Sequence, residues 1–289
     1  MLRRLAFVAL IIALPQAGHA WGVAGHAAIA DIAEAHMTPK ALAEARKLLA
    51  EEGLEHLDQV ASWADEIRPT RKEASPWHYV DIPLTEKSYD AARDCPKGDC
   101  VIEAINRFRA VLADKSRPSL ERREALKFLV HFVGDLQMPL HGAENAGDQG
   151  GNKVLVTYFG NAKGWGDHPL NLHTVWDASI IDRHIHDADM KPEEQRKAAA
   201  PFAAELDKKI SKHDLETKVS VDPLAWAMES HDVAAKVVYP GVVAPGAQPP
   251  ADPVALGEDY DARAWPVVQS RLQLGGLRLA AVLNQTLGS

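Results

Sequence analysis

Histidines and aspartates cluster in residues 131–177 of this chain, at spacings that suit metal binding. His131 and Asp135 are four residues apart, and so are His173 and Asp177. On a helix, this spacing places an imidazole and a carboxylate on one face, one turn apart. A further histidine, His141, follows a proline that should bend or end the helix. Imidazole nitrogens and carboxylate oxygens are common zinc ligands, so the cluster predicts a site for several metal ions.

Two earlier segments supply further candidate ligands. Asp65 and Arg68 are three residues apart, on one face of an expected short helix. His78 lies in the aromatic segment 76–81, which we expect to be extended. Taken alone, Asp65 would be a solvated surface acid and His78 a hydrogen-bonded buried histidine. Together with the downstream cluster, both become candidate metal ligands.

The N-terminus has the features of a secretory signal peptide. Basic residues precede an apolar stretch at 6–14, and Gly18-His-Ala20 offers a cleavage site between small residues. The apolar stretch is too short to span a bilayer. We therefore expect residues 1–20 to be removed and a secreted or periplasmic protein of residues 21–289.

Trp21 would then carry a free amine that can chelate a metal together with its own carbonyl, and His26 could reach the same ion. The alternative is that Trp21 packs in the core and His26 is an ordinary helical residue.

Composition limits the function. A chain of 289 residues with 46% hydrophobic content can bury one sizeable core in a single domain. Its formal net charge is −8, and loss of Arg3 and Arg4 with the leader would make it −10. Such a protein does not hold nucleic acid through a general basic surface. Any phosphate binding must be local and carried by metal.

The chain has two cysteines, Cys95 and Cys100. In an exported protein this close pair indicates a small disulfide-closed loop. Zinc binding by the pair is the alternative, although the chain has no second pair of cysteines to complete such a site.

Hydrophobic spacing predicts a mostly helical chain. Thr38 and Pro39 predict a helix start, as N-cap and first helical residue. One convincing strand, 153–159, reads as half of a small hairpin, and the Pro- and Gly-rich segment 240–257 reads as a surface loop. The fold class is therefore all-α with a minor β-hairpin, in one compact domain. The remaining helices are expected over 23–36, 99–115, 119–137, 170–185, 192–212, 223–238 and 259–287.

The order of motifs along the chain resembles the S1/P1 nuclease family, the zinc-dependent single-strand-specific nucleases of fungi, plants and bacteria. The motifs are Trp-Gly-x-x-Gly-His at 21–26, Trp-Ala-Asp-x-x-Arg at 63–68, His-Tyr-Val-Asp at 78–81, His-Phe-Val-Gly-Asp-x-x-x-Pro-Leu-His at 131–141, Gly-Gly-Asn at 150–152 and Asn-Leu-His-x-x-Trp-Asp at 171–177. We interpret the chain as a bacterial member. The resemblance also implies a disulfide between Cys95 and Cys100, whereas a second disulfide of fungal members has no cysteines here.

The resemblance implies three Zn²⁺ ions as cofactors. The first would be bound by Asp65, His78, His131 and Asp135. The second would be bound by His141, His173 and Asp177. The third would be bound by His26, Asp135 and the amine and carbonyl of Trp21. The charge of three zincs exceeds that of the three carboxylates, which leaves a positive surplus for phosphate.

The resemblance further implies in-line hydrolysis of single-stranded DNA and RNA to 5′-nucleotides by a monomeric enzyme without stable membrane association. Asp65 would orient the attacking hydroxide, and Arg68 would donate hydrogen bonds to the phosphate. Tyr79 would stack on the base, Asp81 would accept hydrogen bonds from the base edge, and Asn152 would support the substrate. A base pocket of this kind requires an unstacked base, which explains single-strand preference. The same site could act on 3′-nucleotides.

Three alternatives remain open from the sequence. Zinc phospholipases C share a similar site but usually have Glu in the place of Asp177, and a lipid pocket has no need of Asp81. A non-catalytic periplasmic zinc-binding protein would have no need of Arg68. A structural metal domain would have a closed site, whereas these ligands leave coordination positions open.

Overall fold

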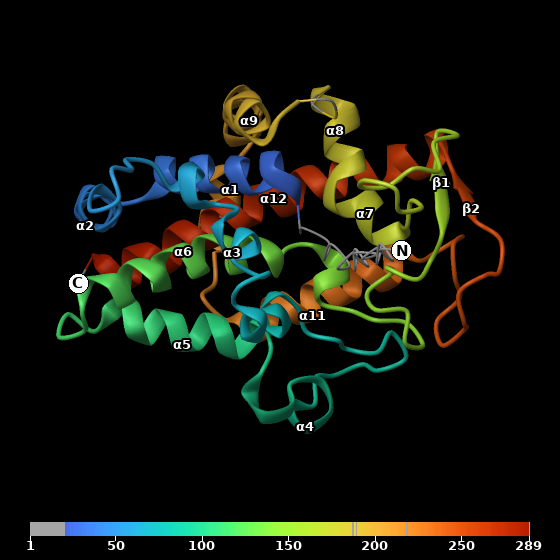
Figure 1. The fold of residues 1–289 in the computed structure, drawn as a ribbon, viewed down its shortest axis with the longest axis horizontal. Coiled ribbons are helices and arrows are strands. Elements are labelled where there is room, and N and C mark those ends of the chain that lie inside the picture. The colour runs from blue at the N-terminus through green and yellow to red at the C-terminus, as the bar shows by residue number, and fades with distance from the viewer. Residues whose placement is uncertain (1–20, 187, 189, 218, 289) are drawn as a thin grey trace, which may run out of the picture.

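The computed structural model describes residues 21–288 except 187, 189 and 218. The expected signal peptide, residues 1–20, lies outside this described part. Three helices form the centre of the fold: α1 (Gly22–His36), α6 (Ser119–Asp135) and α12 (Glu258–Leu287). In Figure 1 α12 runs behind α1, with α9 (Pro192–Asp207) above them, while α5 (Val101–Ala113) lies below α6.

The close contact of α1 with α12 depends on small side chains. A Cβ added at Gly276 of α12 would lie 2.3 Å from Ile32 Cγ2, closer than real Cβ contacts. Helix α1 is rich in buried alanines and is also covered by α9, so it is apolar on most sides. This packing fixes the N-terminal end of α1, where Trp21 and His26 lie.

Most of the remaining α-helices lie within the predicted ranges, but the short helices at Ala91–Asp94 and Lys212–Thr217 were not predicted. Thr38 caps α2 (Pro39–Ala50) by accepting a hydrogen bond from Ala41 N, as predicted. The other α-helices are α3 (Trp63–Glu66), α4 (Ala91–Asp94), α7 (Leu172–Thr174), α8 (Ile180–Ile185), α10 (Lys212–Thr217) and α11 (Pro223–Val233). Short 3₁₀ segments are η1 (Leu57–Val60), η2 (Lys72–His78), η3 (Pro96–Gly98) and η4 (Pro139–His141), and η5 (Val175–Ser179) and η6 (Ala234–Val238) are π-helical. The all-α class is confirmed.

The β element differs from the prediction. Strand β1 (Val156–Tyr158) lies where a strand was expected, but it pairs in parallel with β2 (Val254–Leu256), not within a hairpin. Strand β2 comes from the segment predicted to be a surface loop, so that prediction was wrong over these residues. The pairing joins segments about a hundred residues apart, which local sequence patterns do not reveal (Figure 1).

Segment 76–81 is also only partly extended. It begins inside the 3₁₀ helix η2, and the extended conformation starts at Tyr79. The 3₁₀ turn lets His78 Nδ1 bond to the carbonyl of Ala74, 2.9 Å away.

Within the described part of the chain, none of the helices has the length and apolar character needed to cross a bilayer.

Candidate metal centre

The predicted side-chain ligands come together from six elements of the fold. Helix α6 provides His131 and Asp135, α1 provides His26, and the segments that include α3 and η2 provide Asp65 and His78. His141 comes from η4, and His173 and Asp177 come from the continuous helical stretch α7–η5. Three groups have ligand atoms all within 4.8 Å of one another: His26 with His131 and Asp135, Asp65 with His78 and His131, and His141 with His173 and Asp177.

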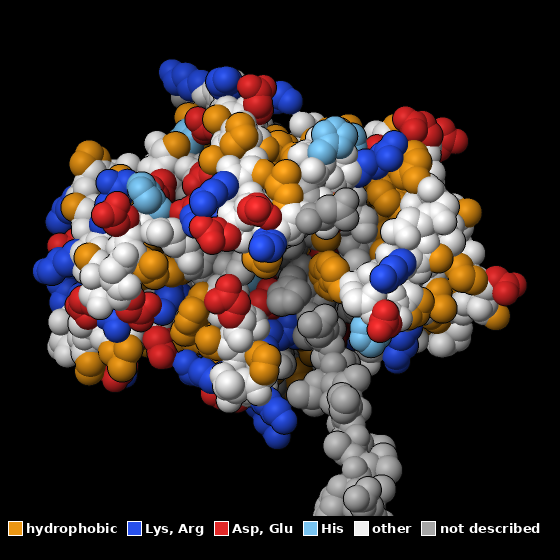
Figure 2. All heavy atoms as spheres, turned by 45° about the horizontal axis from the view of Figure 1, so that its top comes forward, with side chains coloured by type: hydrophobic (Ala, Val, Ile, Leu, Met, Phe, Trp, Pro, Cys, Tyr) orange, Lys and Arg blue, Asp and Glu red, His pale blue; other side chains and the backbone are white. Residues whose placement is uncertain are grey.

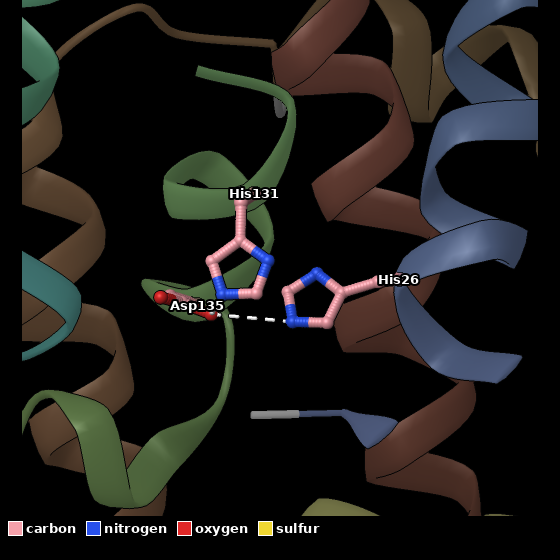
Figure 3. Close-up of side chains that lie close together, drawn as sticks. All are labelled: His26, His131 and Asp135. Atoms are coloured by element: carbon pink, nitrogen blue, oxygen red, sulfur yellow. Dashed lines mark ion pairs between the residues drawn. The ribbon is translucent and has the colours of Figure 1, made fainter. Parts of the chain in front are cut away.

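Asp135 lies between two imidazoles. Its Oδ1 is 3.3 Å from His26 Nε2 and 3.3 Å from His131 Nε2. The two imidazole rings are stacked, with centroids 4.0 Å apart. Figure 3 shows His131 and Asp135 projecting from one helix toward His26 on α1. The i,i+4 spacing within α6 therefore places both groups on one face, as predicted from the sequence.

His131 also links this group to its neighbour. Its Nε2 is 3.4 Å from Asp65 Oδ2, and Asp65 Oδ1 is 3.5 Å from His78 Nε2. The third group is similar: His173 Nε2 is 3.1 Å from Asp177 Oδ2, and the rings of His141 and His173 stack with centroids 5.2 Å apart. Each group thus directs imidazole Nε2 atoms and carboxylate oxygens to one point.

Four of the histidines are oriented by backbone carbonyls. The Nδ1 atom of each lies within hydrogen-bond distance of a carbonyl oxygen, and such a bond fixes the proton on Nδ1. The Nε2 lone pair then faces the group's centre, as a metal requires. The pairs are His78 with Ala74 O at 2.9 Å, His131 with Ala61 O at 2.7 Å, His141 with His78 O at 2.7 Å and His173 with Gly150 O at 2.7 Å.

Burial sets the protonation of these groups. It lowers the pKa of His78 to about 3 and also lowers the pKa values of His131 and His141. Burial opposes protonation of His173 too, but the Asp177 carboxylate, the Gly150 carbonyl and the charge of Asp148 together outweigh burial and raise the pKa of His173. Three of the four imidazoles are therefore neutral at pH 7, the state in which histidine binds metal.

The residues fit divalent metal ions. Asp135 is fully buried, and neither of its carboxylate oxygens has a hydrogen-bond partner in the described part of the chain. The same holds there for the Nε2 atoms of His78 and His131. Burial raises the pKa of Asp135 well above its ordinary value, so its charged form needs a nearby cation. Imidazole nitrogens and carboxylate oxygens are common zinc ligands.

Two of the three groups border a cavity of about 700 Å³. Its wall includes His78, His141 and His173, together with Arg68, which bonds Asp65 Oδ1 through Nη1 at 3.1 Å. An arginine beside a metal-ligand cluster can donate hydrogen bonds to an oxyanion. The cavity is thus equipped to bind an anionic group such as phosphate.

The predicted substrate residues border the same cavity. Tyr79 is 37% exposed, which leaves its ring available for stacking, and its carbonyl accepts a hydrogen bond from Val101 N at 3.0 Å. Burial raises the pKa of Asp81 to about 6. Asn152 Nδ2 donates to Gln149 O at 2.8 Å. All three predicted residues therefore lie where a bound base or sugar could contact them.

Sequence reasoning missed one wall of this cavity. Trp165 and His168 line it from a loop whose ends are held by an antiparallel bridge between Lys163 and Pro169. Gln149 lines it as well. The single signal for this wall was a tryptophan between glycines, Gly164-Trp165-Gly166, in an otherwise polar stretch.

Trp21 is buried and anchors the start of α1. Its side chain is fully buried and donates from Nε1 to Gly134 O at 2.9 Å, so the indole packs in the core, as the alternative interpretation of Trp21 expected. The bond brings the first residue of the expected mature chain beside the α6 turn that carries Asp135. Packing of the indole and chelation by the backbone are therefore compatible.

The cysteines form a disulfide, as predicted. Cys95 and Cys100 are bonded across five residues of sequence, with Cα atoms 5.3 Å apart. The zinc-binding alternative for this pair is wrong, because disulfide sulfurs are not thiolate ligands.

Comparison with known proteins agrees with this geometry. The family model for S1/P1 nuclease matches residues 21–288. Endonuclease 3 of Arabidopsis thaliana is 33% identical over 92% of this chain and 88% of its own length. Nuclease P1 of Penicillium citrinum is 31% identical, over 93% of this chain and 98% of its own length, and Nuclease S1 of Aspergillus oryzae is 28% identical over 98% of both. The chain therefore belongs to the S1/P1 nuclease family and is a hydrolase of nucleic acid.

Proposed function

We propose that this protein is a trinuclear-zinc phosphodiesterase that hydrolyses single-stranded DNA and RNA to 5′-nucleotides, and that the same site accepts 3′-nucleotides. The main supporting observation is that three groups of buried His and Asp side chains meet beside a cavity that also contains Arg68 and Tyr79. The metal groups can act on phosphate, and the aromatic ring can bind a base.

Each zinc has a proposed ligand set. The first zinc is bound by Asp65, His78, His131 and Asp135; the second by His141, His173 and Asp177; and the third by His26, Asp135 and the amine and carbonyl of Trp21. The third set requires Trp21 to be the first residue, so we propose a mature domain of residues 21–289. Bound zinc would supply electrophilic stabilisation of the phosphate and an activated water near neutral pH.

Asp65 and Arg68 are proposed to act directly on the reacting phosphate. The 3.1 Å bond between Arg68 Nη1 and Asp65 Oδ1 holds the two side chains together, and Arg68 lines the cavity. Asp65 would accept a hydrogen bond from the attacking water through a carboxylate oxygen and so orient it. Arg68 would donate hydrogen bonds to the phosphate oxygens as negative charge increases in the transition state.

The base side of the cavity would give single-strand preference. Tyr79 would stack on one base, Asp81 would accept hydrogen bonds from its edge, and Asn152 would contact the sugar or phosphate. A paired and stacked base cannot enter such a pocket without leaving its duplex. On the face shown in Figure 2, acidic and basic side chains are interspersed without a continuous basic patch, so recognition would depend on this pocket and the metals.

Two other assignments complete the proposal. The disulfide suits an oxidising compartment, which supports a secreted or periplasmic location. We also propose a monomer, because one chain supplies every member of the three ligand groups. The phospholipase and zinc-storage alternatives are less well supported, since the family match is to nucleases and Arg68 lies at the cavity.

A direct test compares one oligonucleotide sequence in single-stranded and duplex form, with protein that begins at Trp21. We expect much faster cleavage of the single strand, with 5′-phosphate on the products. A base-free activated phosphodiester serves as a control for chemistry without base binding. Equal rates on both DNA forms would contradict the base-pocket assignment, and hydrolysis of a choline phospholipid without DNA cleavage would favour the phospholipase alternative.

A further inference from the structure

Two buried arginines of α12 reach the end of α6. Arg271 is 4% exposed and Arg278 is 2% exposed. Arg271 Nε donates to the Gln137 carbonyl at 2.9 Å, and Arg278 Nη1 donates to the Gln137 side-chain oxygen at 2.7 Å. The C-terminal helix is thus hydrogen-bonded to the residues that directly follow Asp135.

Ser230 of α11 extends this connection. Its hydroxyl accepts a hydrogen bond from Arg271 Nη2 at 2.7 Å and donates to the Leu136 carbonyl at 2.5 Å. Leu136 is the C-cap residue of α6 and Gln137 follows it, so their carbonyls lie beyond the last turn of the helix. A cation at this position also complements the negative end of the helix dipole. Arg271 and Ser230 therefore act together as a side-chain cap on α6.

The capped turn connects the proposed zinc sites. Asp135 belongs to the first and third ligand sets and His141 to the second, and only five residues separate them. Within this turn Met138 N donates to Asp135 O at 2.9 Å, and His141 N donates to Met138 O at 3.0 Å. Any shift of Leu136 or Gln137 would therefore change the position of Asp135 relative to His141.

The turn is also held tightly against α11. A Cβ added at Gly142 would lie 2.9 Å from the Ala227 carbonyl oxygen and 2.9 Å from Ser230 Cβ. The residue after His141 thus has no space to move toward α11. Hydrogen bonds from Arg271 and close packing at Gly142 fix the turn at both ends.

Apolar side chains would be the simpler way to fill the space between α12, α11 and the turn after α6. Arg271 and Arg278 instead lie side by side and share one acid, Glu229, which bonds Arg271 Nη1 at 3.1 Å and Arg278 Nη2 at 2.7 Å. Burial lowers the pKa of Arg271 to about 10, with a further contribution from neighbouring Arg278. Placing two cations here is costly, so apolar residues of similar volume would stabilise the fold equally well or better. The directional bonds to the turn are what an apolar residue could not supply.

We propose that Arg271 is a positioning residue for the metal centre: through the Gln137 carbonyl and the Ser230 hydroxyl it fixes the turn that sets the distance between Asp135 and His141. The proposal rests on the proposed function, because it requires these two residues to bind zinc. It assigns to the C-terminal helix, far from the ligands in sequence, control over the spacing of the zinc sites.

The test replaces Arg271 by Met, which retains most of the side-chain volume but removes the donors, and by Lys, which retains the charge. Zinc affinity is measured by competition with a chelator, and the geometry of the sites by the visible spectrum of the cobalt-substituted protein. We expect Arg271→Met to weaken zinc binding about 10–100-fold, the usual effect of losing a partner outside the ligand shell. We expect an altered cobalt spectrum, lower kcat on a base-free phosphodiester, and partial recovery in Arg271→Lys.

Arg263→Met is the matched control. Arg263 is on the same helix and also donates to backbone carbonyls, but these are the carbonyls of Val237 and Pro240 and not those of the turn after α6, and its side chain is exposed. We expect this variant to have wild-type zinc affinity and cobalt spectrum.

The outcomes are distinguishable. Wild-type zinc affinity and spectrum in Arg271→Met would overturn the positioning role, even if the metal-free variant is less stable. If Arg271→Met does not fold, Ser230→Ala is judged by the same measurements; it removes only the hydroxyl that links Arg271 to Leu136. An unchanged spectrum and affinity in Ser230→Ala would then overturn the proposal. Failure of the wild-type protein to bind zinc would instead refute the proposed function.

Discussion

Gly134→Ala should selectively disturb the zinc site that includes His26. An added Cβ at Gly134 would lie 2.9 Å from His26 Nδ1 and 3.2 Å from His26 Cε1. His26 cannot simply rotate away, because its ring is stacked on His131 with centroids 4.0 Å apart. The backbone near Gly134 is also held, since its carbonyl accepts the hydrogen bond from Trp21 Nε1. The clash must therefore move His26 away from Asp135.

The energetic effect has two opposing parts. Alanine favours a helix interior over glycine by about 0.5–1 kcal/mol. Overpacking of a tight interior costs about 1–3 kcal/mol. Overpacking should prevail, so we expect the metal-free variant to be about 1–2 kcal/mol less stable than wild type. Because the clash involves a proposed ligand of the third zinc, we expect about one zinc fewer per chain and a large loss of activity.

The assay combines urea unfolding of the metal-free protein with metal analysis of the zinc-loaded protein. Gly276→Ala is the control, because Gly276 is also helical and its added Cβ would lie 2.3 Å from Ile32 Cγ2 without contacting any proposed ligand or the turn after α6. We expect the control to lose stability but retain its zinc. A Gly134→Ala protein with the wild-type number of zincs and wild-type activity would refute the reasoning.

Three further predictions concern different parts of the chain. Tyr79→Ala should weaken binding of single-stranded DNA by roughly 1–3 kcal/mol, the value of stacking on one base, while hydrolysis of a base-free phosphodiester stays unchanged; equal losses on both substrates would contradict the base pocket. One extra residue before Trp21 should reduce activity and zinc content, because the terminal amine is displaced, and full activity in this extended protein would restrict Trp21 to a packing role. Burial, with the nearby charges of Asp58 and Glu34, raises the pKa of Asp31 to about 7. Because the folded state favours the protonated carboxyl, the stability that this group contributes is present at pH 4 and is lost as the pH rises through 7. Asp31→Asn should therefore stabilise the metal-free protein at pH 8 and not at pH 4 in urea unfolding, and equal effects at the two pH values would contradict this.

The parts of the site that could be predicted from the sequence are local. His131 and Asp135 lie on one face of α6 because residues four apart lie on the same face of any α-helix. His173 and Asp177 keep the same relation, although the second lies in a π-helical segment. Proline at 139 correctly marked the end of α6, after which η4 presents His141.

Other features depend on long-range contacts that leave no local pattern. The carbonyls that orient four of the histidines are backbone groups, and backbone groups have no signature in a sequence. Strand β2 pairs with β1 across about a hundred residues, so local sequence patterns alone predict a loop there. Gly134 permits the close approach of His26 from α1, and no local pattern around a helical glycine reveals such a contact.

The most direct test of the account is the metal content of purified protein that begins at Trp21, measured by mass spectrometry of the native chain. The account predicts three zincs per chain, loss of activity on chelation and its recovery when zinc is restored, because the ligands can form three sites. Chelation should also lower the unfolding temperature, since the metals bind the folded state. A metal-free preparation that still cleaves single-stranded DNA would contradict the central claim.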